Sequence, residues 1–343
     1  MAQKEAGKML KTLVQVNSSV FGVHFPGNSF ANLQKSANLL HAAPVSTLTD
    51  PVCASVLSEV EVLVTGWGSE RLTDELLSQM PKLRLVAHLA GTVKNLLTQE
   101  QMARGFVVTQ AAEANALPVA EFTLGAILWH NKSVLTWEKL YREKRSAMSV
   151  RREALYAGVG NRDKVVGVIG ASRVGRQVLR LLRQHRLTVL LQDPFLTTAE
   201  AKALGADLVS QDELLSRSDV VSLHQPLLAT TRKSFSEAQF AQMREGALLI
   251  NTARGAIIDH DAFLPHLQSG RLNAILDVTD PEPLPDESPY WDLPNVMLTP
   301  HIAGSLGHEV LDMTEMVLEE IARFSRGEQL RYAISPDEWD RVA

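Results

Sequence analysis

The sequence predicts an α/β protein with two domains, the second of them a doubly wound parallel sheet. Apolar, strand-like runs alternate with helical stretches along the chain, which is the pattern of parallel sheets with helices on their faces. The length of 343 residues exceeds what one hydrophobic core usually fills. A hydrophobic content of 45% with 21% charged residues is ordinary for a globular protein.

The first third of the chain predicts three strands, separated by a helix and polar turns. The strands are expected over Glu61–Trp67, Leu83–Ala90 and Phe106–Thr109, with an amphipathic helix over Arg71–Met80. Proline is tolerated at a helix start, so Pro118 predicts a helix that opens there and runs over Val119–Val134.

A second and longer series of strands follows. These strands are expected over Val165–Gly170, Thr188–Asp193, Val220–His224, Ala247–Thr252, Ala274–Val278 and Val296–Pro300. Helical stretches such as Arg173–His185 and Asp259–Leu267 lie between them, and this repetition is typical of a nucleotide-binding sheet. An amphipathic helix over His308–Arg326 is expected near the end of the chain.

Composition and charge disfavour several kinds of partner. The net charge of −5 gives no electrostatic reason to expect nucleic acid or an anionic membrane, and the basic stretch 139–152 is flanked and interrupted by glutamates, as in a solvated helix. No run approaches the ~18 apolar residues of a membrane span. The first residues, Met1–Lys11, show no apolar core of a signal peptide. The single cysteine, Cys53, excludes an intrachain disulfide and is expected to pack in the core. We therefore expect a cytoplasmic protein, and no His, Cys, Asp or Glu cluster has the spacing of a metal site.

A glycine-rich turn follows the first strand of the second series. Gly170 and Gly175 occupy the first and third positions of a G-x-G-x-x-G dinucleotide fingerprint, and Arg173 and Val174 lie between them at the start of a helix. Ser172 replaces the middle glycine, whose role is to let the backbone approach a pyrophosphate. A serine hydroxyl can instead donate to a phosphate oxygen, so cofactor binding is still predicted.

Asp193 ends the next strand, where an acidic residue accepts hydrogen bonds from the adenosine ribose and repels a 2′-phosphate. Asp193-Pro194 is also typical of a simple turn. The order of strand, turn, helix, strand and acid favours the cofactor interpretation. No arginine follows Asp193 directly, so NAD is predicted over NADP.

Three segments deliver chemically useful side chains to the ends of successive strands. Asn251-Thr252-Ala253-Arg254-Gly255 carries an arginine, the segment from Asp277 to Pro283 carries Glu282, and Thr299-Pro300-His301 carries an imidazole. Ligands of open parallel sheets bind at the carboxyl ends of the strands. Alone, each residue could be a solvated turn residue or a structural histidine. Together they supply a fixed cation for a carboxylate and a titratable group for moving a proton.

The glycine loop, Ser222–Leu227 and these three segments occur in the same order as in the D-2-hydroxyacid dehydrogenases, which the chain resembles over most of residues 110–305. The resemblance, which extends to glyoxylate and hydroxypyruvate reductases, implies two Rossmann-like domains with a cleft between them. A doubly wound NAD-binding domain over 118–304 would be inserted into a flavodoxin-like substrate domain formed by 1–117 and 305–343. It also implies a homodimer formed through the helical arm of the NAD-binding domain, Val119–Ala157.

The resemblance implies a role for each site residue. Arg254 would bind the substrate carboxylate and polarise its carbonyl, His301 would donate a proton to the keto oxygen as hydride arrives from NADH, and Glu282 would stabilise the protonated imidazole. Asp277 would contact the nicotinamide carboxamide. The full set of cofactor-binding residues that we expect is Gly170, Ser172, Arg173, Val174, Gly175, Asp193, His224, Pro226, Thr252, Ala253, Arg254, Asp277, His301 and Gly304.

The expected substrate-binding residues, beside Arg254, are Gly91, Thr92 and Trp67. In this region the match is looser. Thr92-Val93-Lys94-Asn95 replaces the family's Gly-Val-Asp-Asn, although the amides of Gly91 and Thr92 can still meet a carboxylate. Thr65 and His88 stand where phosphoglycerate dehydrogenases are expected to carry arginines. Trp67 could narrow the pocket or belong to the core.

The leading hypothesis is an NAD-dependent reductase that interconverts a small 2-keto acid and its D-2-hydroxy acid. D-3-phosphoglycerate dehydrogenase is a second enzyme interpretation, whereas formate dehydrogenases differ by a glutamine where Glu282 stands. A protein that senses NAD(H), like the co-repressors built on this scaffold, also keeps the Arg-Glu-His set. The sequence does not name the physiological substrate.

Overall fold

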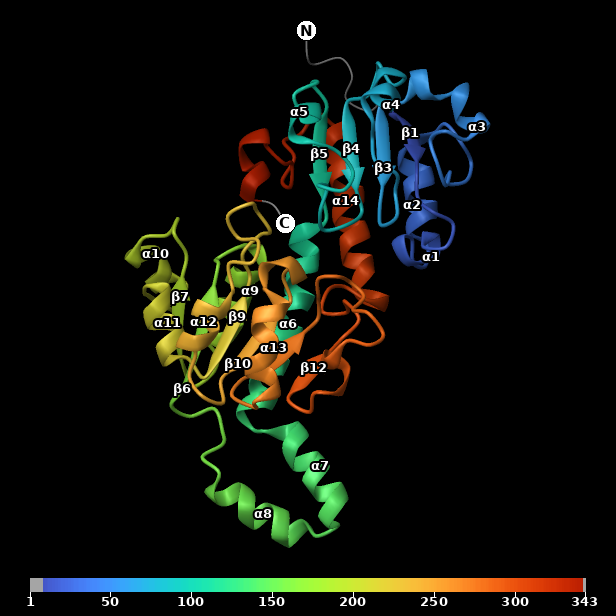
Figure 1. The fold of residues 1–343 in the computed structure, drawn as a ribbon. Coiled ribbons are helices and arrows are strands. Elements are labelled where there is room, and N and C mark those ends of the chain that lie inside the picture. The colour runs from blue at the N-terminus through green and yellow to red at the C-terminus, as the bar shows by residue number, and fades with distance from the viewer. Residues whose placement is uncertain (1–8, 342–343) are drawn as a thin grey trace. The chain divides into compact units, whose positions relative to one another are not determined.

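The computed structural model describes residues 9–341 and divides the chain into two compact units (Figure 1). Unit 1 comprises Met1–Asn115 and Ser305–Ala343, and unit 2 comprises Ala116–Gly304. The chain therefore leaves unit 1 once and returns to it once, so that unit 2 is an insertion in unit 1. The sequence places the first crossing between residues 117 and 118 and the second between 304 and 305.

Unit 1 is built on a five-stranded parallel sheet with the order β2-β1-β3-β4-β5, the flavodoxin-like arrangement. Its strands are β1 (Lys11–Val14), β2 (Asn38–Leu39), β3 (Val62–Thr65), β4 (Leu85–His88) and β5 (Val107–Gln110). Its helices are α1 (Phe21–His24), α2 (Ser29–Ser36), α3 (Pro51–Ala54), α4 (Asp74–Ser78), α5 (Gln99–Met102) and α14 (Val310–Ser325).

Consecutive strand residues in unit 1 face two different cores. Leu63 packs with α3 and α4 residues in one cluster, while Val64 packs with α2 and α14 residues in the other. This alternation follows from the two-residue period of a strand. Both faces of the sheet are covered, which is why its strands are continuous apolar runs in the sequence.

Unit 2 is built on a seven-stranded parallel sheet with the order β12-β11-β10-β9-β6-β7-β8. Counted from β6, this is the doubly wound 3-2-1-4-5-6 order with one more strand. The strands are β6 (Lys164–Ile169), β7 (Leu187–Gln192), β8 (Asp207–Leu208), β9 (Val220–Leu223), β10 (Leu248–Asn251), β11 (Asn273–Leu276) and β12 (Val296–Leu298). The predicted fold class is confirmed.

Helices cover both faces of this sheet as well. They are α6 (Ala112–Asn131), α9 (Arg173–Leu182), α10 (Thr198–Ala203), α11 (Gln211–Arg217), α12 (Glu237–Gln242) and α13 (His260–Gln268). Two more helices, α7 (Val134–Lys144) and α8 (Ala147–Tyr156), do not cover the sheet. Leu249 of β10 packs with α11, α12 and α13, and its neighbour Ile250 packs with α6 and α9.

The start of α6 corrects one sequence prediction. The helix begins at Ala112, so Pro118 lies inside it and not at its first turn, and Ser133 with a positive φ of 51° separates α6 from α7. Proline lacks the N–H that an interior helix position donates. The burial of Ala120 and Ile127 in the core of unit 2 offsets that loss.

Helices α7 and α8 form an arm that projects from the sheet of unit 2 (Figure 1). Its base is closed by hydrogen bonds from Gly160 N to Asn131 O (2.6 Å) and from Asn131 Nδ2 to Asn161 Oδ1 (3.0 Å). Lys144 of α7 forms an ion pair with Glu153 of α8. No side chain of α7 is buried.

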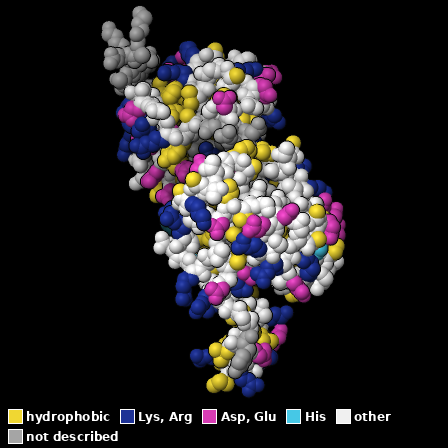
Figure 2. Space-filling view, turned by 90° about the vertical axis from the view of Figure 1, so that its left-hand side faces the viewer, with side chains coloured by type: hydrophobic (Ala, Val, Ile, Leu, Met, Phe, Trp, Pro, Cys, Tyr) yellow, Lys and Arg dark blue, Asp and Glu magenta, His cyan; other side chains and the backbone are white. Residues whose placement is uncertain are grey.

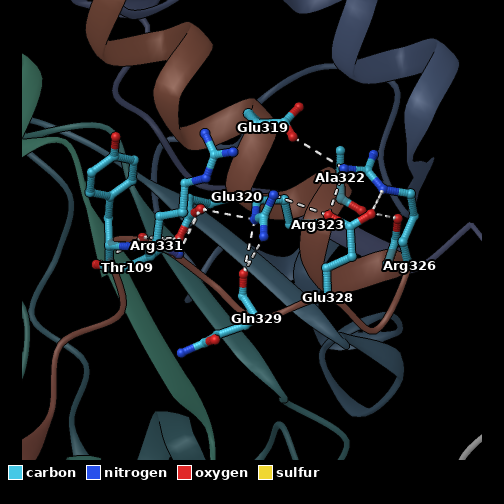
Figure 3. Close-up of polar contacts among 11 residues, drawn as sticks. Thr109, Glu319, Glu320, Ala322, Arg323, Arg326, Glu328, Gln329 and Arg331 are labelled. Carbon is cyan, nitrogen blue, oxygen red and sulfur yellow. Dashed lines mark hydrogen bonds and ion pairs between the residues drawn. The ribbon is translucent and has the colours of Figure 1, made fainter.

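A buried glutamate of α14 attaches the C-terminal segment to β5 (Figure 3). Glu320, which is 1% exposed, accepts hydrogen bonds from the backbone N–H groups of Arg331 and Tyr332 and lies 3.5 Å from the Thr109 hydroxyl. Ile334 N donates to Val108 O at 2.8 Å. Residues from both ends of the chain thus share one sheet in unit 1.

Cys53 is buried, as predicted, and burial raises the pKa of its thiol. Over the part of the chain that the structure describes, no helix has the length and apolar character needed to cross a membrane. Within residues 9–341, no three His, Cys, Asp or Glu side chains gather as metal ligands would. Most of the N-terminal segment inspected for a signal peptide, residues 1–8, lies outside the described residues.

Candidate active site

The three motif loops follow β10, β11 and β12, which are neighbours in the sheet of unit 2. Parallel pairing aligns Asn251 at the end of β10 with Leu276 at the end of β11, and Leu276 with Leu298 of β12. The loops therefore leave the same edge of the sheet side by side. This is the edge at which open α/β sheets bind ligands.

The loop that carries Arg254 is fixed by side-chain and backbone contacts. Asn251 is fully buried; its Oδ1 accepts from Ala253 N (3.0 Å) and its Nδ2 donates to Arg254 O (2.9 Å). A Cβ on Gly255 would lie 1.9 Å from Thr279 O, so only glycine lets this loop pack against the loop after β11.

The Arg254 side chain is half-buried, and its Nη1 donates to Ala253 O at 2.6 Å. Burial lowers the pKa of the guanidinium, and the Glu282 carboxylate opposes that shift. Arginine keeps its charge under such conditions because its pKa starts so high. The structure therefore brings Arg254 within electrostatic reach of Glu282.

Glu282 and His301 form a direct pair. Oε1 of Glu282 lies 2.7 Å from Nδ1 of His301, and the two side chains are 43% and 53% exposed. His301 has a left-handed backbone with φ of 55°, a conformation that costs a non-glycine residue about 1–3 kcal/mol. Its N–H donates to Asp277 O at 3.0 Å. An imidazole oriented through Nδ1 can offer Nε2 to a substrate.

Asp277 has a structural role that the sequence did not reveal. Its carboxylate is 2% exposed and accepts from Thr299 Oγ1 (2.7 Å), Ile302 N (2.8 Å) and Ala303 N (3.0 Å). These donors lie on both sides of His301, so Asp277 anchors the loop that holds the imidazole. Its contact with the nicotinamide stays a prediction.

The glycine loop fits a dinucleotide pyrophosphate. Gly170 has φ of 91°, and a Cβ on Gly175 would lie 2.1 Å from Gly170 O, so both positions require glycine. Ser172 is the N-cap of α9, and its Oγ accepts from Gly175 N at 3.3 Å. The hydroxyl hydrogen of Ser172 and the first-turn amides at Arg173 and Val174 are suited to an anion at a helix N-terminus.

Asp193 directly follows β7 and is half-buried. Its Oδ2 accepts from Ala171 N (2.7 Å) and its Oδ1 from Phe195 N (2.8 Å). The turn that the sequence left as an alternative is therefore present, and it orients the carboxylate beside the glycine loop. The sequence did not identify Arg176, whose Nε donates to Ala171 O at 3.0 Å and which therefore lies near the ribose end of this site.

His224 and Pro226 follow β9, the strand next to β6. His224 is 3% exposed, its Nε2 lies 2.8 Å from Ser222 Oγ, and burial lowers its pKa to about 3. Among the described residues its buried Nδ1 has no hydrogen-bond partner, so this atom is available to a bound cofactor. Pro226 O accepts from Thr231 Oγ1 at 2.6 Å.

Thr252 and Gly304, two further predicted cofactor residues, lie directly after β10 and at the last position of unit 2. Thr252 follows β10, with its hydroxyl 3.3 Å from that of Thr123 on α6. Gly304 is the last residue of unit 2, after the loop that carries His301.

The predicted substrate residues lie in unit 1, at the carboxyl ends of two paired strands. Trp67 follows β3, and Gly91 and Thr92 follow β4. Thr65 Oγ1 lies 2.9 Å from His88 Nδ1, and this contact joins the carboxyl ends of β3 and β4. Both side chains are buried, and burial lowers the pKa of His88 to about 3. The two positions thus carry no cation.

Comparison with known sequences places the chain in a family. Residues 124–303 match the model "D-isomer specific 2-hydroxyacid dehydrogenase, NAD binding domain", which confirms NAD as the cofactor. The chain is 32% identical over 288 residues to a glyoxylate reductase of Korarchaeum cryptofilum, covering 83% of this chain and 80% of the relative. It is 30% identical over 283 residues to a D-3-phosphoglycerate dehydrogenase of Methanocaldococcus jannaschii, covering 82% and 53%. It spans about half the length of such phosphoglycerate dehydrogenases.

Solved structures agree on the fold. D-mandelate dehydrogenase of Rhodotorula graminis in its apo form superposes with a TM-score of 0.79 at 24% identity, covering 96% of this chain and 98% of the other. The TT0316 protein of Thermus thermophilus gives 0.73 at 25% identity, covering 95% and 100%. The chain belongs to the family of D-isomer-specific 2-hydroxyacid dehydrogenases.

Proposed function

We propose that the chain is an NADH-dependent reductase of small, unphosphorylated 2-keto acids, with glyoxylate and hydroxypyruvate as the preferred substrates. The observation that carries this proposal is the grouping of Arg254, Glu282 and His301 on neighbouring loops of unit 2, with the 2.7 Å contact between Glu282 and His301. A cation, a carboxylate and an imidazole are the groups that binding and protonating a 2-keto acid require.

In the proposed mechanism, Arg254 binds the substrate carboxylate through its planar fork and polarises the adjacent carbonyl. NADH supplies the hydride when it is bound. His301 donates the Nε2 proton to the carbonyl oxygen, which becomes the hydroxyl of the D-2-hydroxy acid. Glu282 accepts a hydrogen bond from Nδ1 of the imidazole and holds its orientation. The amides of Gly91 and Thr92 are proposed as further donors to the substrate.

NAD(H) is proposed over NADP(H) because Asp193 presents a carboxylate where the 2′-phosphate of NADP would lie. Arg176 is a cation near Asp193, since its Nε donates to the backbone oxygen of Ala171, whose N–H donates to Asp193. Because that bond directs its Nε to the loop, we assign it to loop structure and not to phosphate binding.

The preference for unphosphorylated substrates rests on Thr65 and His88. These side chains are buried and contact each other, and His88 is neutral because burial depresses its pKa. A phosphate would need a buried counter-charge, since an unpaired charge away from water is costly. Relatives named as phosphoglycerate dehydrogenases and as glyoxylate reductases match this chain about equally well, so the local chemistry decides the proposal.

We also propose a homodimer through the α7–α8 arm. Leu135, Tyr141, Met148 and Leu155 are between 51% and 79% exposed there, beside Trp129 at the end of α6. Figure 2 shows apolar and charged side chains mixed on this arm. A second copy of the chain would cover these apolar residues.

We also propose that the protein acts in the cytoplasm. Its single cysteine is buried, which suits that reducing compartment.

The test is NADH oxidation against a panel of glyoxylate, hydroxypyruvate, pyruvate and bulkier 2-keto acids, with chiral analysis of the product. A reductase turns over at least one of them to the D-isomer. An NAD(H)-sensing co-repressor would instead bind NADH tightly and reduce every member of the panel poorly, and that result would reject the proposed activity.

A further inference from the structure

The carboxyl end of β9 in unit 2 carries two buried polar side chains in contact with each other. Oγ of Ser222 lies 2.8 Å from Nε2 of His224. Ser222 is fully buried and His224 is 3% exposed. Val220 of the same strand packs with α6 and α9, and Ser222 shares its face because side chains alternate along a strand. The contact therefore belongs to the core of unit 2.

His224 packs directly against the glycine loop. Its backbone N–H donates to the backbone oxygen of Ile169 at 2.8 Å, one residue before Gly170. A Cβ on Gly175 would lie 3.3 Å from Cβ of His224, and a Cβ on Gly170 would lie 2.8 Å from the backbone nitrogen of Gln225. The histidine is therefore part of the region of unit 2 whose turn fits a dinucleotide pyrophosphate.

The imidazole of His224 is neutral at physiological pH, because burial lowers its pKa to about 3. In a neutral imidazole one ring nitrogen carries a hydrogen and the other accepts one. Nδ1 is buried and has no hydrogen-bond partner among the described residues. The contact with Ser222 therefore decides which of the two nitrogens carries the hydrogen.

The two possible directions of this hydrogen bond differ in the groups that they leave unpaired. If His224 donates from Nε2, the described residues offer the hydroxyl hydrogen of Ser222 no acceptor and the Nδ1 lone pair no donor. If Ser222 donates to Nε2, only the N–H at Nδ1 is left, and an oxygen of a bound cofactor can accept from it. Buried donors and acceptors without partners are costly, so the second direction is favoured.

We infer that Ser222 is a positioning residue for the cofactor: its hydroxyl donates to Nε2 of His224 and leaves Nδ1 as an N–H donor to an oxygen of NAD(H). A dinucleotide presents acceptor oxygens on its phosphates and riboses. An N–H beside the glycine loop complements such oxygens, whereas a lone pair on Nδ1 would repel them. The inference concerns cofactor binding and goes beyond the proposed function, because it does not depend on the substrate that is reduced.

The direct test is the tautomer of His224 in the unmodified enzyme. In protein labelled with ¹⁵N-histidine, two-bond ¹⁵N–¹H correlations distinguish the two neutral tautomers, and the signals of His224 are assigned by their loss in His224→Gln. We expect the hydrogen on Nδ1, both without NADH and after NADH is added. A hydrogen on Nε2 in either state would overturn the inference.

Substitutions of Ser222 test its connection to the cofactor. Ser222→Ala is expected to lower the population of the Nδ1–H tautomer. It is also expected to raise the Kd for NADH, measured by fluorescence titration, by about 5–10-fold, which corresponds to one hydrogen bond. Ser222→Thr keeps a hydroxyl, so we expect it to retain the tautomer and most of the affinity.

Ser218→Ala is the matched control. Ser218 is also fully buried, precedes the opposite end of β9, and its hydroxyl has no hydrogen-bond partner among the described residues. Its removal is expected to change neither the tautomer of His224 nor the Kd for NADH. If Ser222→Ala raises the Kd no more than Ser218→Ala does, Ser222 serves packing alone and the inference is overturned.

Neither measurement uses a 2-keto acid, so the inference and the proposed function can fail separately. An enzyme with the expected tautomer and affinities that reduces no 2-keto acid would reject the proposed function and support the inference. An enzyme that reduces 2-keto acids with the hydrogen of His224 on Nε2 would do the reverse.

Discussion

The two units hold their functional loops with different chemistry. In unit 2 the loop of His301 is held by Asp277, a buried carboxylate that accepts three hydrogen bonds. In unit 1 the loops of Trp67 and Thr92 are held by His24 and His88, which are neutral because burial depresses the pKa of each. A carboxylate can fix several amides around one catalytic group. Neutral imidazoles fix a loop while adding no charge to it.

The largest effect on turnover is expected when His301, which lies on the loop anchored by Asp277, is replaced. We expect His301→Ala to lower kcat by about 10²–10⁴-fold, the usual contribution of general acid catalysis. NADH affinity, measured by fluorescence titration, is expected to be nearly unchanged. Retention of full turnover would remove His301 from the mechanism.

The second-largest effect on turnover is expected at Asp277, which anchors the loop of His301. We expect Asp277→Ala to lower kcat by roughly 10²-fold, because small displacements of a catalytic group are that costly. In the His301→Ala background the same substitution should cause little further loss. Asp280→Asn is the matched control, since its exposed side chain forms an ion pair with Arg232 at 3.5 Å. Weaker NADH binding with kcat retained would instead support the predicted nicotinamide contact.

In unit 1, His24 should make the stability of the chain sensitive to acid. The pKa of His24 is about 4 in the folded chain against an ordinary value of 6.5, so the unfolded chain binds a proton first as pH falls. Stability is therefore complete above pH 6.5 and is lost as pH falls toward 4. The linkage amounts to about 2 kcal/mol between pH 7 and pH 5. Urea unfolding at both pH values measures it, and His24→Gln is expected to remove that share; an equal pH dependence in the variant would contradict this origin.

The smallest effect is expected at the cofactor end of unit 2, where no catalytic group is involved. Asp193→Ser removes the charge that opposes a 2′-phosphate, so the preference for NADH over NADPH should fall by roughly 10-fold, about 1.4 kcal/mol. The ratio of kcat/KM for the two cofactors measures it. An unmodified enzyme that uses NADPH as well as NADH would contradict the predicted preference.

Sequence analysis predicted unit 2 well because its motifs depend on local geometry. Gly170, Gly175 and Gly255 stand where a Cβ would collide with backbone, and the loops that carry Arg254, Glu282 and His301 begin where strands end. The parallel sheets also followed from the alternation of apolar runs and helices. The strands β1, β2 and β8 were not predicted; β2 and β8 have two residues each, too few to show a periodicity.

The anchors could not be predicted because they depend on contacts between distant segments. The sequence did not single out His24, whose Nε2 accepts from Trp67 N, 43 positions away. The donors to Asp277 come from the loop after the next strand. The sequence analysis wrongly expected α6 to begin at Pro118. The packing of this helix outweighs the preference of proline for the first turn.

The central claim is that the chain reduces small, unphosphorylated 2-keto acids, and one measurement tests it most directly. The kcat/KM of the unmodified enzyme with NADH should be compared for hydroxypyruvate and phosphohydroxypyruvate, which differ only by the phosphate. Since Thr65 and His88 offer no cation, we expect hydroxypyruvate to be preferred by at least about 10-fold. A larger kcat/KM for phosphohydroxypyruvate would contradict the account and assign the chain to phosphoglycerate chemistry.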